Sequence, residues 1–125
     1  MNEKLTSNQL YINQETLIKS KERVRSHGEV FTPTPLVAEM CDILPAEMFM
    51  PEKKFLEPSC GNGNFLAEIL RRKLDNSNTW MDALTAAGSL YGIDILEDNV
   101  REGRRRRLGA AAGSLAPWGG GAGGA

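Results

Sequence analysis

The sequence has no apolar run long enough to span a bilayer, and its first residues lack the basic and apolar pattern of a signal peptide. We therefore expect a cytoplasmic protein with no membrane partner. Cysteine is scarce, and the spacing of Cys41 and Cys60 fits no metal motif, so both are expected to be reduced thiols. His27 is the one histidine, and a solvated place at a helix end is favoured over a ligand or a base. The sequence thus predicts no metal site.

The segment 54–65 carries the most information about function. Phe55 and Leu56 follow two lysines, as expected for the end of a buried parallel strand. Pro58 cannot donate a ladder hydrogen bond, so strand pairing should stop near it. Gly61 and Gly63 permit a sharp turn and the close approach of a ligand to the backbone. Taken alone, such a Gly-x-Gly turn is most often only a tight connection.

A helix is predicted over residues 65–74, directly after this turn. Apolar residues fall on one stripe of it and basic residues in its last turn, where the helix dipole favours cations. The stripe consists of Phe65, Leu66, Ile69 and Leu70, and the basic residues are Arg71, Arg72 and Lys73.

Residues 89–95 predict a second short strand that a right-handed crossover would place parallel to the first. It ends at Asp94, and an acid at this place is the usual partner of ribose hydroxyls. Asp94 could instead cap a helix that starts near Asp98. We prefer the ligand interpretation, because Glu97 and Asp98 already serve the helix end.

These segments resemble three motifs of the adenine-specific N6 DNA methyltransferases of restriction-modification systems. Residues 57–65 (Glu-Pro-Ser-Cys-Gly-Asn-Gly-Asn-Phe) are similar to motif I, and residues 91–94 (Tyr-Gly-Ile-Asp) to motif II. Upstream, residues 20–33, which end in Phe-Thr-Pro, are similar to motif X. The three motifs occur in the family's order, and the resemblance covers about residues 18–103.

The resemblance implies S-adenosylmethionine as the cofactor. Thr32 would offer its hydroxyl and amide to the carboxylate of the methionine end, and Glu57 would lie near the amino group. The turn from Gly61 to Gly63 would pack beneath the cofactor, and Asp94 would hold the ribose. The cofactor-binding positions implied in this way are Phe31, Thr32, Pro33, Glu57, Pro58, Ser59, Cys60, Gly61, Gly63, Asp94 and Ile95.

Two of these positions have a second interpretation. Ile95 would pack on the adenine ring, but an isoleucine just past a strand is equally well explained as core. Cys60 could be taken for a nucleophile, as in cytosine methyltransferases. We reject this, because the cysteine there lies in a Pro-Cys motif well after motif I, and an amine acceptor needs no covalent enzyme intermediate.

About thirty residues separate the glycine turn from Asp94, where a compact unit has nearer twenty. A short extra helix over residues 79–87 explains the surplus. Thr79 and Asp82 have capping-box spacing, and Gly88 ends the helix. Its predicted apolar stripe consists of Trp80, Met81, Leu84 and Ala87.

Two further helices are expected before the first strand. Residues 1–12 are polar and expected to be loosely ordered, and a helix from the N-cap Asn13 to about Ser26 would pair Glu15 with Lys19, with Gly28 past its end. The next helix begins near Pro35 and extends up to Pro45. Its stripe consists of Leu36, Val37, Met40, Cys41 and Leu44.

The C-terminal part changes composition at an arginine-rich run, Arg101 and residues 104–107. Such a run can neutralise phosphates, but we favour a solvated helix face. Residues 109–125 are rich in glycine and alanine, without charge or periodicity, and are expected to be disordered. We hypothesise that the authentic reading ends near residues 104–108, and that a frame change, the edge of an assembled sequence or an engineered addition supplies the rest.

Catalysis in the resembled family needs an Asn/Asp/Ser-Pro-Pro-aromatic motif, motif IV, and the sequence has no Pro-Pro pair. The fold class expected is therefore α/β, a truncated N-terminal part of a class I, Rossmann-like methyltransferase fold with two parallel strands plus helices. The expected division is a helical extension over 1–30, a partial cofactor-binding domain over 31–108 and a tail over 109–125. By itself such a chain would be inactive.

Two classes of function follow. In the first, the chain is the cofactor-binding portion of an enzyme that methylates adenine N6 in DNA, with DNA and restriction or specificity subunits as partners. In the second, it is a non-enzymatic fragment or nucleic-acid interaction module. Within the enzyme class, protein or RNA methyltransferases are the runner-up, but they usually carry an Asp-x-Gly-x-Gly-x-Gly form of motif I that this chain lacks.

Overall fold

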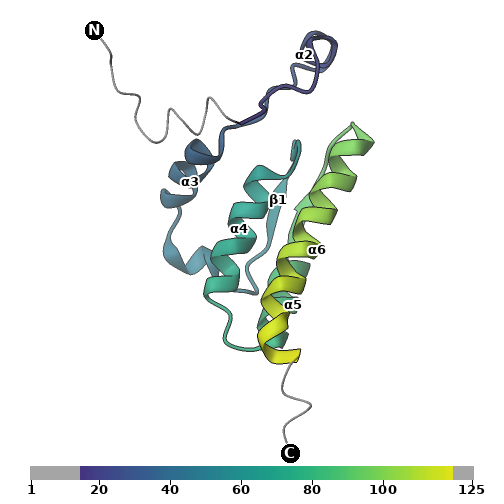
Figure 1. Cartoon of the computed structure of the whole chain (residues 1–125). Helices are drawn as coiled ribbons and strands as arrows, with labels where there is room; N and C mark the ends of the chain where they lie inside the picture. The colour runs from purple at the N-terminus through teal and green to yellow at the C-terminus, as the bar shows by residue number, and fades with distance from the viewer. Residues whose placement is uncertain (1–14, 120–125) are drawn as a thin grey trace, which may run out of the picture.

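The computed structural model describes residues 15–119, so the expectations for residues 1–12, Asn13 and residues 120–125 lie outside the described part. The structure combines a short two-stranded sheet with helices, and the chain passes from α2 at one end to the long helix α6 (Figure 1). The elements in order are α2 (Lys21–His27), α3 (Thr34–Asp42), the 3-10 helix η1 (Ala46–Phe49), β1 (Phe55–Glu57), α4 (Asn64–Asp75), α5 (Trp80–Gly88), β2 (Leu90–Gly92) and α6 (Glu97–Gly119).

The two strands pair in parallel, as predicted. Phe55 lies opposite Leu90 and Glu57 opposite Gly92. Beyond the strand ends, the Ile93 amide donates to the Glu57 carbonyl and the Cys60 amide to the Ile93 carbonyl, both at 2.9 Å. These two bonds bring the segments after the strands together. The mixed helix and strand arrangement is compatible with a methyltransferase fold.

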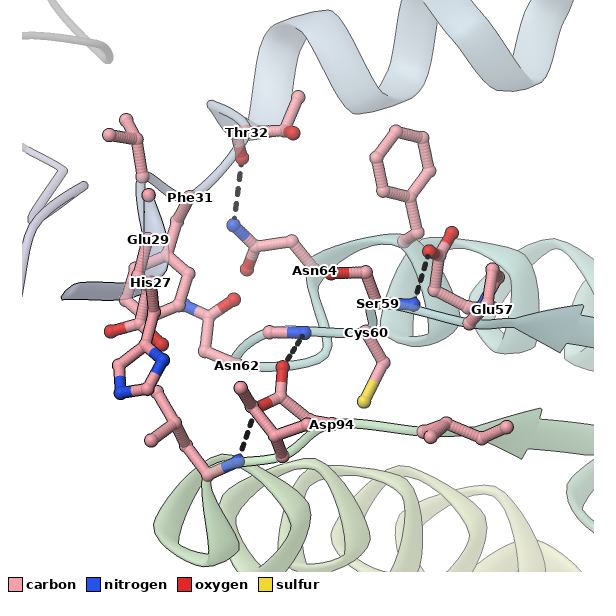
Figure 2. Close-up of a pocket in the computed structure, with 18 residues that line it drawn as sticks. His27, Glu29, Phe31, Thr32, Glu57, Ser59, Cys60, Asn62, Asn64 and Asp94 are labelled. Carbon is pink, nitrogen blue, oxygen red and sulfur yellow. Dashed lines mark hydrogen bonds between the residues drawn. The ribbon is translucent and has the colours of Figure 1, made fainter. Parts of the chain in front are cut away.

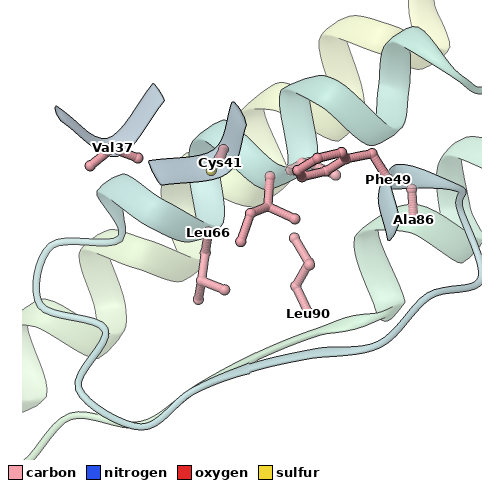
Figure 3. Close-up of a cluster of buried hydrophobic side chains, with 8 residues drawn as sticks. Val37, Cys41, Phe49, Leu66, Ala86 and Leu90 are labelled. Carbon is pink, nitrogen blue, oxygen red and sulfur yellow. The ribbon is translucent and has the colours of Figure 1, made fainter. Parts of the chain in front are cut away.

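The hydrophobic core lies around α4, which packs against α3, α5 and α6 (Figure 3). The predicted stripe of α4 faces this core, with Leu66, Ile69 and Leu70 buried. Each apolar side chain buried in this way contributes about 1.5–3 kcal/mol relative to an exposed one. The buried cluster consists of Val37, Cys41, Phe49, Leu66, Ile69, Leu70, Ala86 and Leu90.

Lys73 lies in the last turn of α4, as predicted, but it does not face solvent. Its side chain is fully buried, and its ammonium lies 5.3 Å from the centre of the Phe55 ring. The ammonium donates to the carbonyls of Met50 (2.9 Å), Pro51 (3.2 Å) and Lys53. Lys73 therefore joins the end of α4 to the loop before β1, while burial lowers the pKa of its ammonium.

The first described helix begins later than predicted. Residues 15–20 are not helical, and α2 begins after its N-cap Ser20. The predicted pair of Glu15 with Lys19 does not form, because Glu15 accepts from the Thr34 amide and hydroxyl, both at 2.8 Å, and Lys19 binds acids of α6. Tertiary partners outweigh a surface pair worth about 0.2–0.5 kcal/mol. Gly28 ends α2 in the left-handed conformation, as predicted.

Helix α3 ends at Asp42, before the predicted boundary at Pro45. Only part of its predicted stripe is buried. Val37 and Cys41 face the core, whereas Leu36, Met40 and Leu44 are exposed.

Helix α5 has the predicted start, since the Thr79 hydroxyl accepts from the Asp82 amide at 3.1 Å. Of its predicted stripe, only Ala87 packs against the core cluster. Ala83 and Ala86 are buried, and the large residues Trp80, Met81 and Leu84 are exposed. The small alanines face inward because α5 packs against both α4 and α6, where small side chains allow close approach.

Helix α6 corrects the expectation of a disordered segment after residue 108. It continues to Gly119, so residues 109–119 are helical. Ala111 is buried, which shows that the segment packs on the body. The expected solvated arginine face is only partly present: Arg106 donates to the Asn62 carbonyl at 3.0 Å and to Asn64 Oδ1 at 2.9 Å. None of the helices within the described range is long and apolar enough to cross a membrane.

Candidate functional site

A cavity of about 430 Å³ lies where three segments distant in sequence meet (Figure 2). One wall is the segment after α2, the second is the turn between β1 and α4, and the third is the segment after β2. The lining residues are 27–32, 57–62, Asn64, Phe65 and 93–96.

Most of the site residues predicted from the sequence line this cavity. Pro33 and Gly63 do not line it. Pro33 is the N-cap of α3, and Gly63 is buried within the turn. The predicted residues that line it are Phe31, Thr32, Glu57, Pro58, Ser59, Cys60, Gly61, Asp94 and Ile95.

The turn between β1 and α4 needs both glycines. Gly61 and Gly63 have φ values of 52° and 89°, a region that other residues rarely adopt. A Cβ at Gly61 would lie 3.1 Å from the Phe31 ring, and a Cβ at Gly63 would lie 3.1 Å from the Gly103 backbone. The turn therefore supports the Phe31 wall on one side and touches α6 on the other.

Asp94 holds the turn and the start of α6 together. Its Oδ2 accepts from the Gly61 amide at 3.0 Å, and its Oδ1 accepts from the Leu96 amide at 2.8 Å. The Leu96 amide lies before the first residue of α6, so Asp94 bonds the segment that leads into the helix rather than an amide of the helix itself. Its carboxylate also lines the cavity, so these bonds and a ligand role are compatible.

Glu57 is the second acid that the sequence analysis predicted for this site. It accepts from the Ser59 amide at 3.1 Å, which bends its side chain back over the turn (Figure 2). Ile95 is 80% exposed, so the core interpretation of this residue was wrong. The cavity thus combines the carboxylates of Glu29, Glu57 and Asp94 with apolar surface.

Several residues of the site were missed by the sequence analysis. Asn64 connects two walls, since its side chain donates to the Thr32 carbonyl at 2.9 Å and to Glu15 at 3.3 Å. Glu29 lines the cavity, and the side-chain amide of the buried Asn99, on α6, donates to Glu29 Oε2 at 2.6 Å. The position of Asn64 directly after the glycine turn is a usable signal, but nothing local in the sequence marks Glu29 or Asn99.

Ion pairs hold the first wall against α6. Arg23 contacts Glu29 at 2.7 Å and Asp98 at 2.8 Å, and Lys19 contacts Asp98 at 2.8 Å. Hydrogen bonds from Arg23, and then from Lys19, hold the pKa of Asp98 well below its usual range. The same carboxylates raise the pKa of Arg23.

The chemistry of Cys60 does not favour a nucleophile. Burial raises the pKa of its thiol, and the nearby Asp94 carboxylate adds to this effect. A protonated thiol is a poor nucleophile. Within residues 15–119, no group of three or more His, Cys, Asp or Glu side chains is placed to hold a metal ion.

The chain is 32% identical over 95 residues to the type II methyltransferase M.VspI of Vibrio sp. (strain 343). This match covers 76% of the chain and 20% of the relative, so the chain spans about a fifth of the length of the curated relative it matches. No family model matches, and no solved structure matches. The sequence match therefore supports a relationship to a methyltransferase.

Proposed function

We propose that the cavity is an S-adenosylmethionine site, and that this chain is the cofactor-binding portion of an enzyme that methylates adenine N6 in DNA. The observation that carries the proposal is the meeting of the Phe31 and Thr32 segment, the glycine turn and Asp94 around one cavity. These segments lie far apart in sequence and follow the order of motifs X, I and II. The type II methyltransferase relative supports the same class of reaction.

The residues in the cavity fit the chemistry of this cofactor. Its volume of about 430 Å³ lies within the range of about 300–1,000 Å³ that is usual for small-molecule sites. The acid Glu57 suits an ammonium group, Asp94 suits ribose hydroxyls, and the exposed Ile95 suits the face of an adenine ring. The amide and hydroxyl of Thr32 are the donors proposed for the carboxylate.

Bound S-adenosylmethionine would supply a methyl group on a sulfonium, and this chain would hold and orient it. The chain contains no Pro-Pro pair, so the residues that accept the target amine are not among its 125 residues. We infer that the chain alone binds the cofactor without methylating DNA. Restriction or specificity subunits are further partners under this proposal.

Calorimetric titration of the full chain with S-adenosylmethionine tests the cofactor assignment. We expect binding by the wild-type chain and its loss in Asp94→Ala. Removing a carboxylate that accepts from a ligand costs about 1.5–3 kcal/mol, which is a loss of affinity of about tenfold or more.

Asp82→Ala is the matched control for this substitution. Asp82 also accepts from a backbone amide near a helix start, that of Asn78 at 3.0 Å, but it lies on α5 outside the cavity. The control should retain cofactor affinity. Equal affinity in Asp94→Ala and the wild type would contradict the assignment.

One feature favours the second candidate function, a nucleic-acid interaction module. Arg101, Arg104 and Arg105 are exposed on α6. Titrations with duplex DNA at two salt concentrations, for the wild type and for variants in which one of these arginines is replaced, measure their contribution. Replacing an arginine that neutralises a phosphate would weaken the salt dependence of binding. Salt-dependent DNA binding with no response to the cofactor would favour this candidate over the first.

A further inference from the structure

Asn99 is a fully buried polar side chain in the first turn of α6. Its amide nitrogen donates to Glu29 Oε2 at 2.6 Å and to Asp94 Oδ1 at 3.3 Å. Its oxygen accepts from the Lys19 ammonium at 2.7 Å. One side chain thus contacts both acids and a cation from the N-terminal segment.

The two acids belong to opposite walls of the cavity. Glu29 follows α2, and Asp94 follows β2. Two carboxylates brought near each other repel, and a donor shared between them offsets that repulsion. Arg23 also binds Glu29, and two backbone amides bind Asp94. The Asn99 amide is the donor that bonds both acids, so it links the position of one carboxylate to that of the other.

The hydrogen bonds of Asp94 leave little freedom for its carboxylate. A carboxylate has about four acceptor positions. Gly61, Leu96 and Asn99 occupy three of them, and the remaining one is on Oδ2. A ligand hydroxyl would be accepted there, in a direction that these three donors fix.

We propose that Asn99 is a positioning residue of the cavity, and that it orients Asp94 to accept a hydrogen bond from a ribose hydroxyl. This inference rests on the proposed cofactor site. A purely structural role for Asn99 would lower the affinity for every ligand equally. A positioning role changes the preference between ligands that carry the hydroxyl and ligands that lack it.

The experiment compares S-adenosylhomocysteine with its 2′-deoxy and 3′-deoxy analogues by calorimetric titration of the full chain. A hydrogen bond to a charged acceptor is worth about 1.5–3 kcal/mol, so the wild type should bind the ribose form at least about tenfold more tightly than one of the analogues. Asn99→Ala should reduce this preference to less than about threefold.

Asn76→Ala is the matched control. Asn76 also donates from its side-chain amide, to the Phe49 carbonyl at 3.1 Å, but it lies at the end of α4 outside the cavity. This variant should keep the wild-type preference. Asn99→Leu is the second variant, because it keeps the size of the side chain while it removes the donor and adds no charge beside Glu29 and Asp94, and it should lose the preference in the same way.

The outcomes separate the two proposals. An unchanged ribose preference in a folded Asn99 variant, checked by circular dichroism, would overturn the positioning role and leave the cofactor site standing. A wild-type chain that binds neither S-adenosylhomocysteine nor S-adenosylmethionine would overturn the cofactor site and the positioning role together.

Discussion

Lys73 shows how a charged residue becomes part of the interior of this protein. Its ammonium satisfies three carbonyls in the loop before β1, and its stem lies in the core beside Phe55. A buried ammonium is tolerated only where hydrogen bonds replace its lost hydration. The loop carbonyls in turn depend on Lys73 for a partner.

Lys73→Met should therefore destabilise the fold although it adds an apolar side chain of similar length. It leaves the carbonyls of Met50, Pro51 and Lys53 without their donor, and we expect a loss of about 2 kcal/mol. Urea unfolding followed by circular dichroism measures this loss. Lys54→Met, at an exposed lysine, is the control and should change stability by less than about 0.5 kcal/mol.

Asp94 and Asn99 also act as single residues that join several partners. Asp94 was predicted from its place after a strand, and its contacts with Gly61 and Leu96 join the glycine turn to the segment before α6. Asn99 has no local signal, because its three partners come from residues 19, 29 and 94. Only the folded chain brings them together.

Among the elements, the glycine turn and α6 depend on each other. Gly63 adopts a left-handed backbone conformation, and it lies against the backbone of Gly103. A residue with a side chain at position 63 would be strained by this conformation and would crowd Gly103. The absence of a side chain at Gly63 lets α6 approach the turn that lines the cavity. The length of α6 was not predicted, because its last part is rich in glycine and alanine and has no apolar periodicity.

Two substitutions of glycine by alanine should have opposite signs. Gly63→Ala combines a left-handed φ with a contact to the Gly103 backbone, and we expect a loss of about 2 kcal/mol. Gly109→Ala lies within α6 with nothing within 4 Å of the new Cβ, and it should stabilise the chain by about 0.5–1 kcal/mol. Thermal unfolding compares both variants with the wild type. A neutral Gly109→Ala without added helical signal would contradict a helix through residue 109.

For the whole molecule, ion pairs and one aromatic ring fasten the N-terminal segment to the body. Phe31 is 6% exposed and packs on Gly61, while Lys19 and Arg23 bind acids of α6. The side chain of Glu29 completes this cluster from the cavity wall. The position of the first wall of the cavity therefore depends on these ion pairs.

The stability of the chain should fall in acid because of Asp98. Arg23 and Lys19 lower the pKa of this acid below its ordinary value of 3.8, so its contribution is present above about pH 4 and is lost as pH falls through the lowered value. Asp98→Asn should be less stable than the wild type at pH 7 and should lose less stability between about pH 4 and pH 2. Urea unfolding at several pH values measures both.

Asp75→Asn is the control for this acid dependence, since Asp75 pairs with Arg71 on the exposed surface of α4. Its unfolding curves should follow those of the wild type. Parallel acid curves for Asp98→Asn and the wild type would show that the pairs of Asp98 do not contribute to stability.

The sheet presents one apolar face to solvent. Leu56 and Tyr91 are neighbours in the register, and they are 64% and 50% exposed. Ile93, just past β2, is 54% exposed. Helix α4 packs against β2 while these side chains are exposed, so one face of the two-stranded sheet is covered and the other is not.

Secondary structure was predicted correctly where a local pattern has only one physical interpretation. The strand ends, the glycine turn, α4 and the start of α5 follow from apolar spacing, capping residues and the conformational freedom of glycine. Predictions failed where a pattern is compatible with two arrangements of the side chains. The apolar stripe of α5 was wrong at Trp80, Met81 and Leu84, because alanines rather than these large residues pack between the helices.

The sequence by itself determined the order of the motifs and the acids and glycines placed after each strand, because these depend on neighbouring residues alone. Tertiary structure decided which partners the charged residues chose. Glu15 and Lys19, four residues apart, separated to bind Thr34 and Asp98, because contacts with the folded body outweigh a solvated local pair. The same long-range packing buried Lys73 and placed Asn99 between Glu29 and Asp94.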